Sequence, residues 1–499
     1  IDGLTGTGGS NGVKIEDNAG AATVQIHNNS FTNLGFGIQN VMTAVVDATC
    51  NWYGTAVPAA VASKISGPVS YSPFLTDGTD DQPGTIGFQP VSGSCNGLAT
   101  DLYVNDNSQT GDVYTTAIGN DANPGTPAAP FATVAHAVSV ANAGNTIYVD
   151  AGTYNENINI NKANITLKGA NFGTNCSGRG PAGESVINSL SGPGSSVIII
   201  GADGVTVDGF TISGASATYG VSASGMSDVS VKHNIITDLG ASGAQSTSTF
   251  GIGVAITTAA LSGINLSDNC ISDIRGGSGV GNTGGAVGIG VGFTNADFDV
   301  SGVTIDGNII SNISASTAAY GSGGRGAYGV LINVGASGSH AGKAISPVVS
   351  NNEISILTGL WAHGVGLEGE TPGASVVNNK IFTLSGNLGS VDANGVKVED
   401  NVGAATVQIH DNSFEGMTNG VVNVMTELVV DATCNWYGAG VIKATADVIY
   451  IPYRTNGTDD SGATGFQPTG LCTACAVILV ITDPEPVCSP NTVDITAAA

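Results

Sequence analysis

The side chains that could do chemistry begin with aspartates that recur in two matching loops. Clustered carboxylates beside glycine and asparagine carbonyls suit Ca²⁺, which takes about six to eight oxygen ligands in irregular geometry. Asx turns in solvated loops explain the same residues without a metal. Calcium is therefore a candidate ligand, and the sequence predicts no required cofactor. The candidate metal ligands are Asp77, Asp80, Asp81, Asp459 and Asp460, and a second acidic group comprises Asp101, Asp106, Asp112 and Asp121.

Basic residues offer little for catalysis. A lyase that removes a proton beside a sugar carboxylate needs a base, with carboxylates or calcium to neutralise the acid. A hydrolase needs two or three carboxylates that converge on one strand face. The sequence predicts no catalytic residue, because its arginines occupy separate loops and none lies in a run with paired aspartates. These arginines are Arg179, Arg275, Arg325 and Arg454.

Histidine and aromatic residues occur at duplicated positions. His27 and His410 each follow an inward-facing isoleucine by one residue, so strand alternation turns them outward as surface residues. The pairs Trp52–Tyr53 and Trp436–Tyr437 could form a platform for a sugar ring. We favour the other interpretation, in which they close the apolar end of a domain.

These duplicated positions belong to a long internal repeat. Residues 11–31 (NGVKIEDNAGAATVQIHNNSF) and 394–414 (NGVKVEDNVGAATVQIHDNSF) agree at 18 of 21 positions. The blocks DATCNWYG, GTDD and GFQP also occur twice and in the same order. A repeat of this length is a whole domain, so we interpret the chain as a window onto a tandem array.

The repeat predicts three segments. Residues 1–98 are the C-terminal part of an upstream unit, and residues 99–475 form a complete unit. Residues 476–499 are interpreted as a linker and the start of a different, immunoglobulin-like domain. The complete unit divides into a cap (101–156), coils (157–440) and a closing segment (441–475).

Cysteine usage predicts disulfides, and hence an oxidising, extracellular setting. The eight cysteines are an even number, and no second half accompanies Cys472-x-x-Cys475 as a zinc site would require. Two pairings follow the repeat, because each joins DATCNWYG to a cysteine just after GFQP. These are Cys50–Cys95 and Cys434–Cys472, and single-copy candidates are Cys176–Cys270 and Cys475–Cys488.

Composition limits the partners of the chain. The formal net charge of −26, with 13 basic and 39 acidic residues, argues against nucleic acid because no basic stretch exists to neutralise phosphates. No apolar run reaches the length of a membrane span, and AVILVIT at 476–482 is far too short. The apolar residues are mainly Ala, Val and Ile, which favours β-structure.

Short runs of Val and Ile, separated by turns, extend from residue 157 to 423. Two fixed features per period, an asparagine and a glycine, with variable loops between them, predict an all-β, right-handed parallel β-helix (a solenoid). Asparagine at a fixed corner would take the tight bend and hydrogen-bond the next coil. The expected stacking asparagines are Asn234, Asn269, Asn308, Asn352, Asn379 and Asn412.

One short helix is predicted in front of the coils. Pro130 suits a first helical turn, and Ala and Val recur at three- and four-residue spacing from Phe131 to Ala141. Gly144 would end the helix. Such a short, one-sided helix suits covering an end of the solenoid, as an N-terminal capping helix.

The segment 119–160 resembles the N-terminal cap of secreted β-helix proteins of the pectin-lyase-like superfamily. The ATCNWYG and GTDD…GFQP blocks resemble closing segments of β-helix units in very large surface proteins of Bacteroidota, exported by the type IX route. That superfamily includes polysaccharide lyases and hydrolases. Of the glycoside hydrolase motifs NTD, DD, GHG and RIK, however, only DD is present, in the closing loops.

The resemblance implies a structural stalk of an extracellular adhesin or filament at the cell surface, serving adhesion, gliding or prey capture. Its expected partners are neighbouring repeat units, identical chains in a bundle, and a cell-surface or polysaccharide ligand. The chain is not expected to be an enzyme. The alternative is a carbohydrate-binding or polysaccharide-degrading β-helix whose long loops at 240–248, 276–285 and 335–343 form a groove.

Overall fold

The computed structural model describes part of the chain between residues 10 and 472. Residues 17–23, 43, 45, 98–100, 181, 241–247, 278–283, 293–296, 317–324, 336–340, 387–392, 400–405, 426–428, 446 and 471 within it are not described. The described chain divides into two compact units. The first comprises residues 1–190, 197–213 and 229–234, and the second comprises 191–196, 214–228 and 235–499. This division falls inside the predicted 99–475 unit, because the coils of a solenoid contact only their neighbours and share no single core.

The N-terminal part of the first unit is a short stack of parallel strands with one helical turn. Its strands are short because Gly and Asn interrupt every apolar run, and Phe31 and Ile38 belong to its own buried cluster. The helix was not predicted. The elements are β1 (Asn11–Ile15), β2 (Phe36–Asn40) and β4 (Ile65–Ser66) in one sheet, β3 (Val46–Asp47) with β5 (Val69–Ser70), α1 (Pro58–Ala62), and antiparallel β6 (Phe74–Leu75) with β7 (Cys95–Gly97).

The rest of the first unit holds the cap and the first coils. Its strands pair only in parallel, each with the corresponding strand of the next coil. One sheet contains β8 (Asp101–Val104), β9 (Thr146–Val149), β12 (Thr166–Lys168), β15 (Thr206–Asp208) and β18 (Ser230–Lys232). The others contain β10 (Gly152–Tyr154), β13 (Ser185–Asn188) and β16 (Phe210–Gly214), and β11 (Ile158–Ile160) with β14 (Ser196–Ile200).

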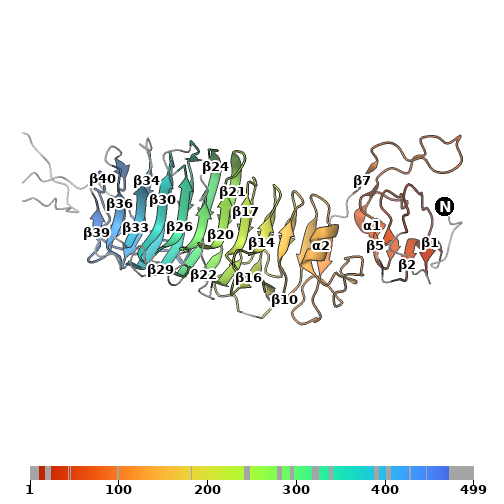
Figure 1. Cartoon of the computed structure of the whole chain (residues 1–499), viewed down its shortest axis with the longest axis horizontal. Coiled ribbons are helices and arrows are strands. Elements are labelled where there is room, and N and C mark those ends of the chain that lie inside the picture. Colours follow the sequence, from red (N-terminus) through yellow and green to blue (C-terminus); the bar gives the residue numbers. More distant parts are fainter. Residues whose placement is uncertain are drawn as a thin grey trace, which may run out of the picture. The chain divides into compact units, whose positions relative to one another are not determined.

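The predicted capping helix is α2 (Val134–Val140), which contacts β8, β9 and β11 (Figure 1). It is shorter than expected, because Thr133 is extended and caps it by accepting from the His136 N–H. Pro130 therefore precedes the helix. Ala141 is already extended, before Gly144.

The second unit consists of three parallel sheets. The first contains β19 (Ile235–Leu239), β22 (Cys270–Arg275), β25 (Ile309–Ser314), β29 (Glu353–Gly359), β32 (Lys380–Gly386), β35 (Ser413–Glu415) and β38 (Trp436–Tyr437). The second contains β17 (Tyr219–Ser224), β20 (Thr249–Ala255), β23 (Ala286–Val291), β26 (Gly326–Val334), β30 (Trp361–Gly369), β33 (Ala393–Glu399), β36 (Asn419–Asn423) and β39 (Ile442–Ala444). The third contains β21 (Leu261–Ser267), β24 (Val300–Asp306), β28 (Val348–Ser350), β31 (Ser375–Val377), β34 (Gln408–His410), β37 (Val430–Asp431) and β40 (Val448–Ile449), with β27 (Ala344–Ile345) beside β24.

Buried aliphatic columns fill the interior of the second unit. Ile252, Ile289, Val330 and Val365 are register partners in successive strands of the second sheet, and each is at most 1% exposed. The predicted right-handed parallel β-helix is confirmed. No helix among the described residues is long and apolar enough to cross a membrane.

A column of glycines explains the second feature of the sequence period. A Cβ on Gly329 would lie 2.7 Å from the Gly364 carbonyl oxygen and 2.4 Å from the Ile354 side chain. Gly364 has the same relation to the next coil, 2.6 Å from the Gly395 oxygen. Only glycine leaves room within these strands for the next coil's carbonyl oxygen and for the isoleucine of the first sheet.

Candidate functional site

The predicted asparagines form a hydrogen-bonded column in the second unit. The Oδ1 of Asn352 accepts from the backbone N–H of Asn308 at 2.9 Å and from its side-chain amide at 3.0 Å. The side-chain amide of Asn352 also donates to the Ile305 carbonyl at 2.9 Å. All members are 0% exposed, so the column supplies partners for polar groups that water cannot reach. The column comprises Asn269, Asn308, Asn352, Asn379, Asn412 and Asn435.

The tight bend is made by the residue before each asparagine, not by the asparagine itself as the sequence suggested. Asn351, Asn378 and Asp411 have φ values of 53°, 58° and 55°. The following asparagine is then free to point inward and bond the next coil. Asn234 lies in the first unit, where its Oδ1 accepts from the Phe210 N–H at 3.0 Å.

The closing segments of the two copies have the same construction. Trp436 lies under the glycine of the repeated GTD block, since a Cβ on Gly457 would lie 2.5 Å from its ring. Gly78 lies 2.3 Å from the Trp52 ring by the same measure. The Tyr437 hydroxyl donates to the Ala432 carbonyl, and in the upstream copy the Tyr53 hydroxyl donates to the Ala48 carbonyl. Tyr53 is buried, whereas Trp52, Trp436 and Tyr437 are partly buried.

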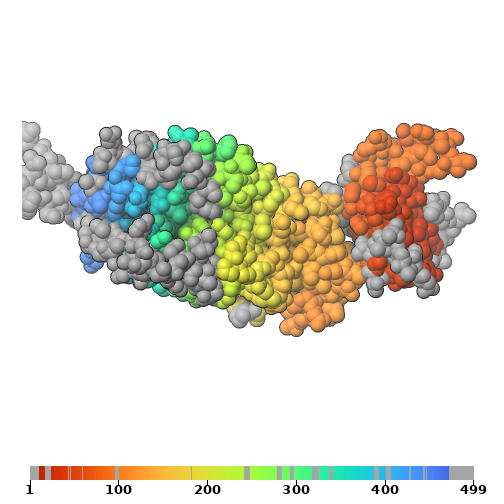
Figure 2. Space-filling view, viewed as in Figure 1, coloured from red at the N-terminus to blue at the C-terminus, as the bar shows by residue number. Residues whose placement is uncertain are grey.

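The downstream closing segment folds back along the coils of its unit. Arg454 pairs with Asp411, and the Phe466 N–H donates to the Asn378 carbonyl at 2.8 Å. Phe466 is only 1% exposed. In the upstream copy the corresponding loop, residues 76–94, projects from the N-terminal turns (Figures 1 and 2), and Ile86 is fully exposed.

Disulfides tie both closing segments to their coils. Cys50–Cys95 and Cys434–Cys472 are bonded pairs. Cys50 and Cys434 occupy the left-handed corner position, with φ values of 55° and 61°. Cys176 and Cys270 are each disulfide-bonded as well. Cys475 and Cys488 lie outside the described residues. Disulfides of this number indicate an oxidising, extracellular environment.

The histidines at the duplicated positions lie at the surface, each beside an aspartate. His410 Nε2 lies 3.1 Å from an Asp431 oxygen, and His27 Nε2 lies 3.5 Å from Asp47. Both side chains are about one-third exposed, at 27% and 31%. This is the outward orientation that strand alternation indicated.

The candidate calcium ligands of the upstream loop shape turns. Asp77 accepts from the N–H and hydroxyl of Thr79 at 2.9 and 2.7 Å, which lowers the pKa of Asp77. Asp80 accepts from the Gln82 and Gln89 N–H groups, and the Asp81 N–H donates to the Gln89 carbonyl. Each contact is internal to the loop.

The downstream aspartates have comparable roles. Asp459 accepts from the Gln467 N–H at 3.1 Å and lies 3.9 Å from the Lys380 ammonium. Asp460 accepts from Thr469. Across the described part of the chain, no three His, Cys, Asp or Glu side chains are grouped as metal ligands would be.

Carboxylates in the cap hold its irregular loop and the start of α2. Buried Asp150, which sequence reasoning missed, accepts from the N–H groups of Val113, Tyr114 and Thr115 at 2.6–3.0 Å. Asp121 accepts from the Thr133 N–H and hydroxyl, both at 2.9 Å.

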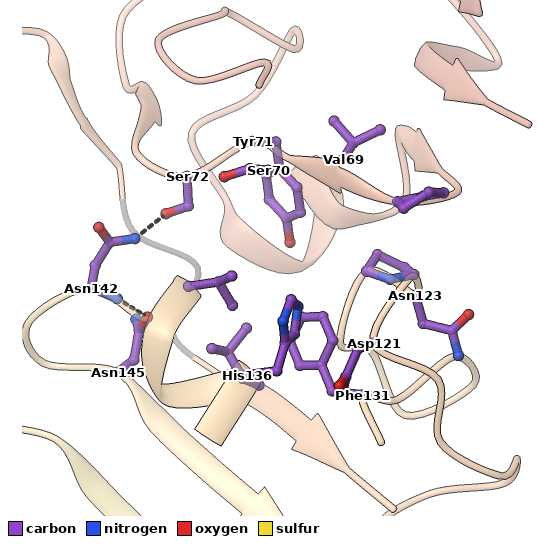
Figure 3. Close-up of a pocket in the computed structure, with 14 residues that line it drawn as sticks. Val69, Ser70, Tyr71, Ser72, Asp121, Asn123, Phe131, His136, Asn142 and Asn145 are labelled. Carbon is purple, nitrogen blue, oxygen red and sulfur yellow. Dashed lines mark hydrogen bonds between the residues drawn. The ribbon is translucent and has the colours of Figure 1, made fainter. Parts of the chain in front are cut away.

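The helix side of the cap is held in the same way. Glu156 accepts from the N–H groups of Val134 and Ala135 in the first turn of α2, and burial raises the pKa of Glu156. Figure 3 shows the labelled side chains around this end of α2, including Phe131 and His136, whose ring centroids are 4.8 Å apart. Just past the helix, the Asn142 N–H donates to the Asn145 side chain. Asp121, Asp150 and Glu156 thus all accept from the backbone of the cap itself.

Three of the four arginines hold the structure together. Arg179 forms a buried ion pair with Glu184, at 3.0 Å between Nε and Oε1, and also donates to the His233 carbonyl. Arg275 pairs with Asp238 on the surface. Arg454 pairs with Asp411 in the closing segment described above. Each of these three arginines thus binds a different part of the described structure.

The fourth arginine, Arg325, lines a cavity of about 380 Å³ on the second sheet of the second unit. Its wall is aromatic. The rings of Tyr219 and Phe250 stack with centroids 5.2 Å apart and planes 6° from parallel. Tyr328 and Trp361 complete the aromatic lining. Arg325 is the one charged residue among the described residues that line this cavity.

The aromatic wall is fixed in place by hydrogen bonds beneath it. The Trp361 indole N–H donates to the Tyr328 hydroxyl at 2.8 Å, and that hydroxyl donates to Glu368 at 2.8 Å. Burial, with the charge of Glu368, raises the pKa of Tyr328 well above its usual value. Burial also raises the pKa of Glu368. The network therefore orders two ring faces at the cavity.

A buried histidine lies next to this network in the same side-chain column. His363 is 1% exposed, and its ring centroid lies 5.3 Å from that of Tyr328. Burial, followed by the charge of Lys397, lowers the pKa of His363 to about 3, so the ring is neutral at neutral pH. Its Nε2 has no partner among the described residues.

Residues 117–326 match the model of DUF1565, described as a protein of unknown function. No curated protein matches the chain. Among solved structures, the chain is similar to an alginate lyase from Paenibacillus sp. str. FPU-7, with 14% identity, a TM-score of 0.36 and coverage of 63% of this chain and 95% of that one. It is also similar to a GH136 lacto-N-biosidase from Eubacterium ramulus, with 11% identity, a TM-score of 0.33 and coverage of 71% and 67%. At these values no activity is transferred to this chain.

Sequence reasoning missed the aromatic cavity. Its aromatic residues lie in strands β17, β20, β26 and β30, which are separated by long variable loops. The available signal was a large aromatic residue directly before the glycine that recurs in each period, as in Tyr219-Gly220, Phe250-Gly251 and Tyr328-Gly329. Those rings come together only because the glycines stack in register.

Proposed function

We propose that the chain is a structural β-helix module of a large extracellular adhesin or filament, acting as a stalk at the cell surface. One observation carries the proposal. The closing construction of Trp, Tyr, asparagine and disulfide occurs twice in one chain, and a capped β-helix follows its first occurrence. This order is what units strung one after another require.

The described interactions suit a module that bears load rather than one that turns over substrate. Parallel strand ladders, an asparagine column and disulfides resist separation of coils. Each coil depends mainly on its neighbours, so the resistance is repeated along the unit. The proposal assigns the chain no catalytic step.

Labelling of intact cells tests the location. Antibodies raised against the full chain should label structures that project from the surface of the source cells, and deletion of the repeat region should reduce attachment. Labelling only after the cells are opened would contradict a surface stalk.

Force spectroscopy tests the mechanical role separately. The full chain, held by both termini, should unfold at higher force with its disulfides intact than after reduction. Extension at low force in both states would remove the mechanical argument, even if the chain is at the surface.

A further inference from the structure

One asparagine-glycine pair differs from the others in its surroundings. The sequence contains five such pairs, and the strands β1, β7, β33 and β36 contain four of them. The fifth, Asn456–Gly457, lies outside the strands in the downstream closing segment, and Asn456 is exposed. Asparagine before glycine loses its side-chain amide readily, because glycine leaves the attacking backbone nitrogen unhindered. The fold therefore places one of five reactive pairs in a loop.

The turn at Asn456 prepares its side chain for this reaction. Its Oδ1 accepts from the Thr458 N–H at 3.2 Å. This Asx turn bends the side chain over the following peptide, toward the Gly457 nitrogen. The same Thr458 N–H would stabilise the negative charge that develops on Oδ1 when Cγ is attacked. The loop thus provides both the approach of the nitrogen and a donor for the oxyanion.

Two pairs in the strands of the second unit are held in the opposite state. Asn394 is 1% exposed and Asn419 is 3% exposed, and the Asn419 side-chain amide donates to Asn394 Oδ1 at 2.8 Å. Ring closure requires the peptide to rotate out of the extended conformation. Parallel pairing of β33 with β36 opposes this rotation. Burial also keeps away the water that completes the reaction.

The upstream copy shows that the same turn accommodates a carboxylate. Asp77 occupies the position of Asn456 in the matching sequence Asx-Gly-Thr-Asp. It accepts from the Thr79 N–H and from the Thr79 hydroxyl, at 2.9 and 2.7 Å. An aspartate at position 456 would find the same two donors on Thr458. The aspartate product of deamidation therefore fits the downstream loop.

We propose that Asn456 is a deamidation site, through which the downstream closing segment acquires the carboxylate of the upstream copy. The Gly457 nitrogen loses its proton to hydroxide and forms a bond to Cγ of Asn456, and the side-chain nitrogen leaves as ammonia. Water then opens the cyclic imide at either carbonyl, which gives aspartate or isoaspartate. Hydroxide and water are the co-reactants, and no oxidant or reductant takes part. The inference goes beyond the stalk function and does not depend on it.

The two products differ in their effect on the closing segment. Aspartate keeps the length of the main chain, whereas isoaspartate adds one methylene group to it. Gly457 lies against the Trp436 ring so closely that a Cβ would be 2.5 Å from it. The added methylene group shifts Gly457 from this position. Isoaspartate should therefore loosen the closing segment, and aspartate should not.

The test incubates the folded full chain at mildly alkaline pH and analyses its peptides by mass spectrometry. The peptide with Asn456 should gain the mass of an amide-to-acid conversion and should accept methyl groups from an isoaspartyl methyltransferase. Peptides with Asn394 and Asn419 should stay unchanged, but they should convert when the chain is incubated in urea. An intact Asn456, or equal conversion of Asn394 and Asn419 in the folded chain, overturns the proposal.

Two variants complete the experiment. Asn456→Gln keeps an amide but cannot close the five-membered ring readily, so its peptide should remain unmodified over the same incubation. Freshly purified Asn456→Asp carries the aspartate product alone, and its thermal unfolding midpoint should equal that of the fresh parent chain. The incubated parent chain, which contains isoaspartate, should unfold at a lower midpoint than Asn456→Asp. Equal midpoints would overturn the loosening of the closing segment.

Discussion

The side-chain oxygen of Asn379 accepts two hydrogen bonds from Asn352, one from its backbone N–H at 3.0 Å and one from its side-chain amide at 2.9 Å. Both residues are 0% exposed. Neither donor can turn to water instead. One side chain therefore satisfies two buried groups of the preceding coil.

Replacing this asparagine should be costly. Asn379→Ala leaves two buried donors of Asn352 unpaired, and each such group costs about 1–3 kcal/mol. The free energy of unfolding should fall by about 2 kcal/mol or more, measured by urea denaturation. Exposed Asn161→Ala serves as the control and should change it little. Similar effects in both variants would contradict the role of the column.

The closing segment should tolerate a methyl group at one glycine and not at another. A Cβ on Gly457 would lie 2.5 Å from the Trp436 ring, whereas nothing lies within 4 Å of one on Gly462. Gly457→Ala should lower stability by about 1–3 kcal/mol, as overpacking does. Thermal unfolding of the two alanine variants compares them directly. Equal midpoints would show that the indole is not held under this glycine.

Removing one partner of the buried pair Arg179–Glu184 should cost more stability than replacing both partners with apolar residues. The side chains are 5% and 3% exposed, so Arg179→Met leaves a buried carboxylate without its partner. That loss costs about 3–5 kcal/mol, while an apolar pair of similar volume is often neutral. Urea denaturation should therefore show that Arg179→Met with Glu184→Met recovers much of the stability. A double variant no better than the single would refute this.

Acid should destabilise the protein partly through His363. Its pKa in the folded state is about 3, below the ordinary 6.5, so the unfolded chain binds more protons between these values. The contribution of neutral His363 to the free energy of unfolding is complete above pH 6.5, and it is lost as the pH falls from 6.5 toward 3. His363→Gln should reduce the loss of stability between pH 7 and pH 4.5.

The comparison between variant and parent isolates this residue. Glu368 has a raised pKa and acts in the opposite sense, favouring the fold when protonated, but it is present in both proteins. Urea midpoints of both proteins at the two pH values provide the measurement. An unchanged pH dependence in His363→Gln would mean that the imidazole titrates without effect on folding.

The fold could be predicted from the sequence because a solenoid repeats its constraints. The period of Asn234 to Asn412 and the glycine before each second strand are visible without knowing which loops separate them. The bend was assigned to the wrong residue, because the preceding position varies among Asn, Asp, Gly, His and Cys, whereas the asparagine after it is constant. Only backbone angles distinguish the bend from the ladder.

Sites in the loops and on the second sheet were harder to predict from the sequence. Asp150 follows a strand like many aspartates here, and nothing in its neighbours shows that it holds three N–H groups about 35 residues upstream. Arg325 and Tyr219 are separated by more than one hundred residues. Their common cavity depends on how many coils lie between them, which variable loops conceal.

The asparagine column has a direction. The side-chain oxygen of each column asparagine from Asn308 to Asn435 accepts hydrogen bonds from the asparagine of the preceding coil. The amide dipoles therefore point the same way along the stack. The backbone carbonyl of each column asparagine accepts from an N–H of the following coil, and at the last member, Asn435, that donor is the Arg454 N–H of the closing segment. A coil inserted in the middle would extend this polarity, whereas one added at the end would have to displace Arg454. Duplication of an internal coil therefore keeps the dipole direction and the closing contact of Arg454, whereas addition of a coil at the C-terminal end does not keep that contact.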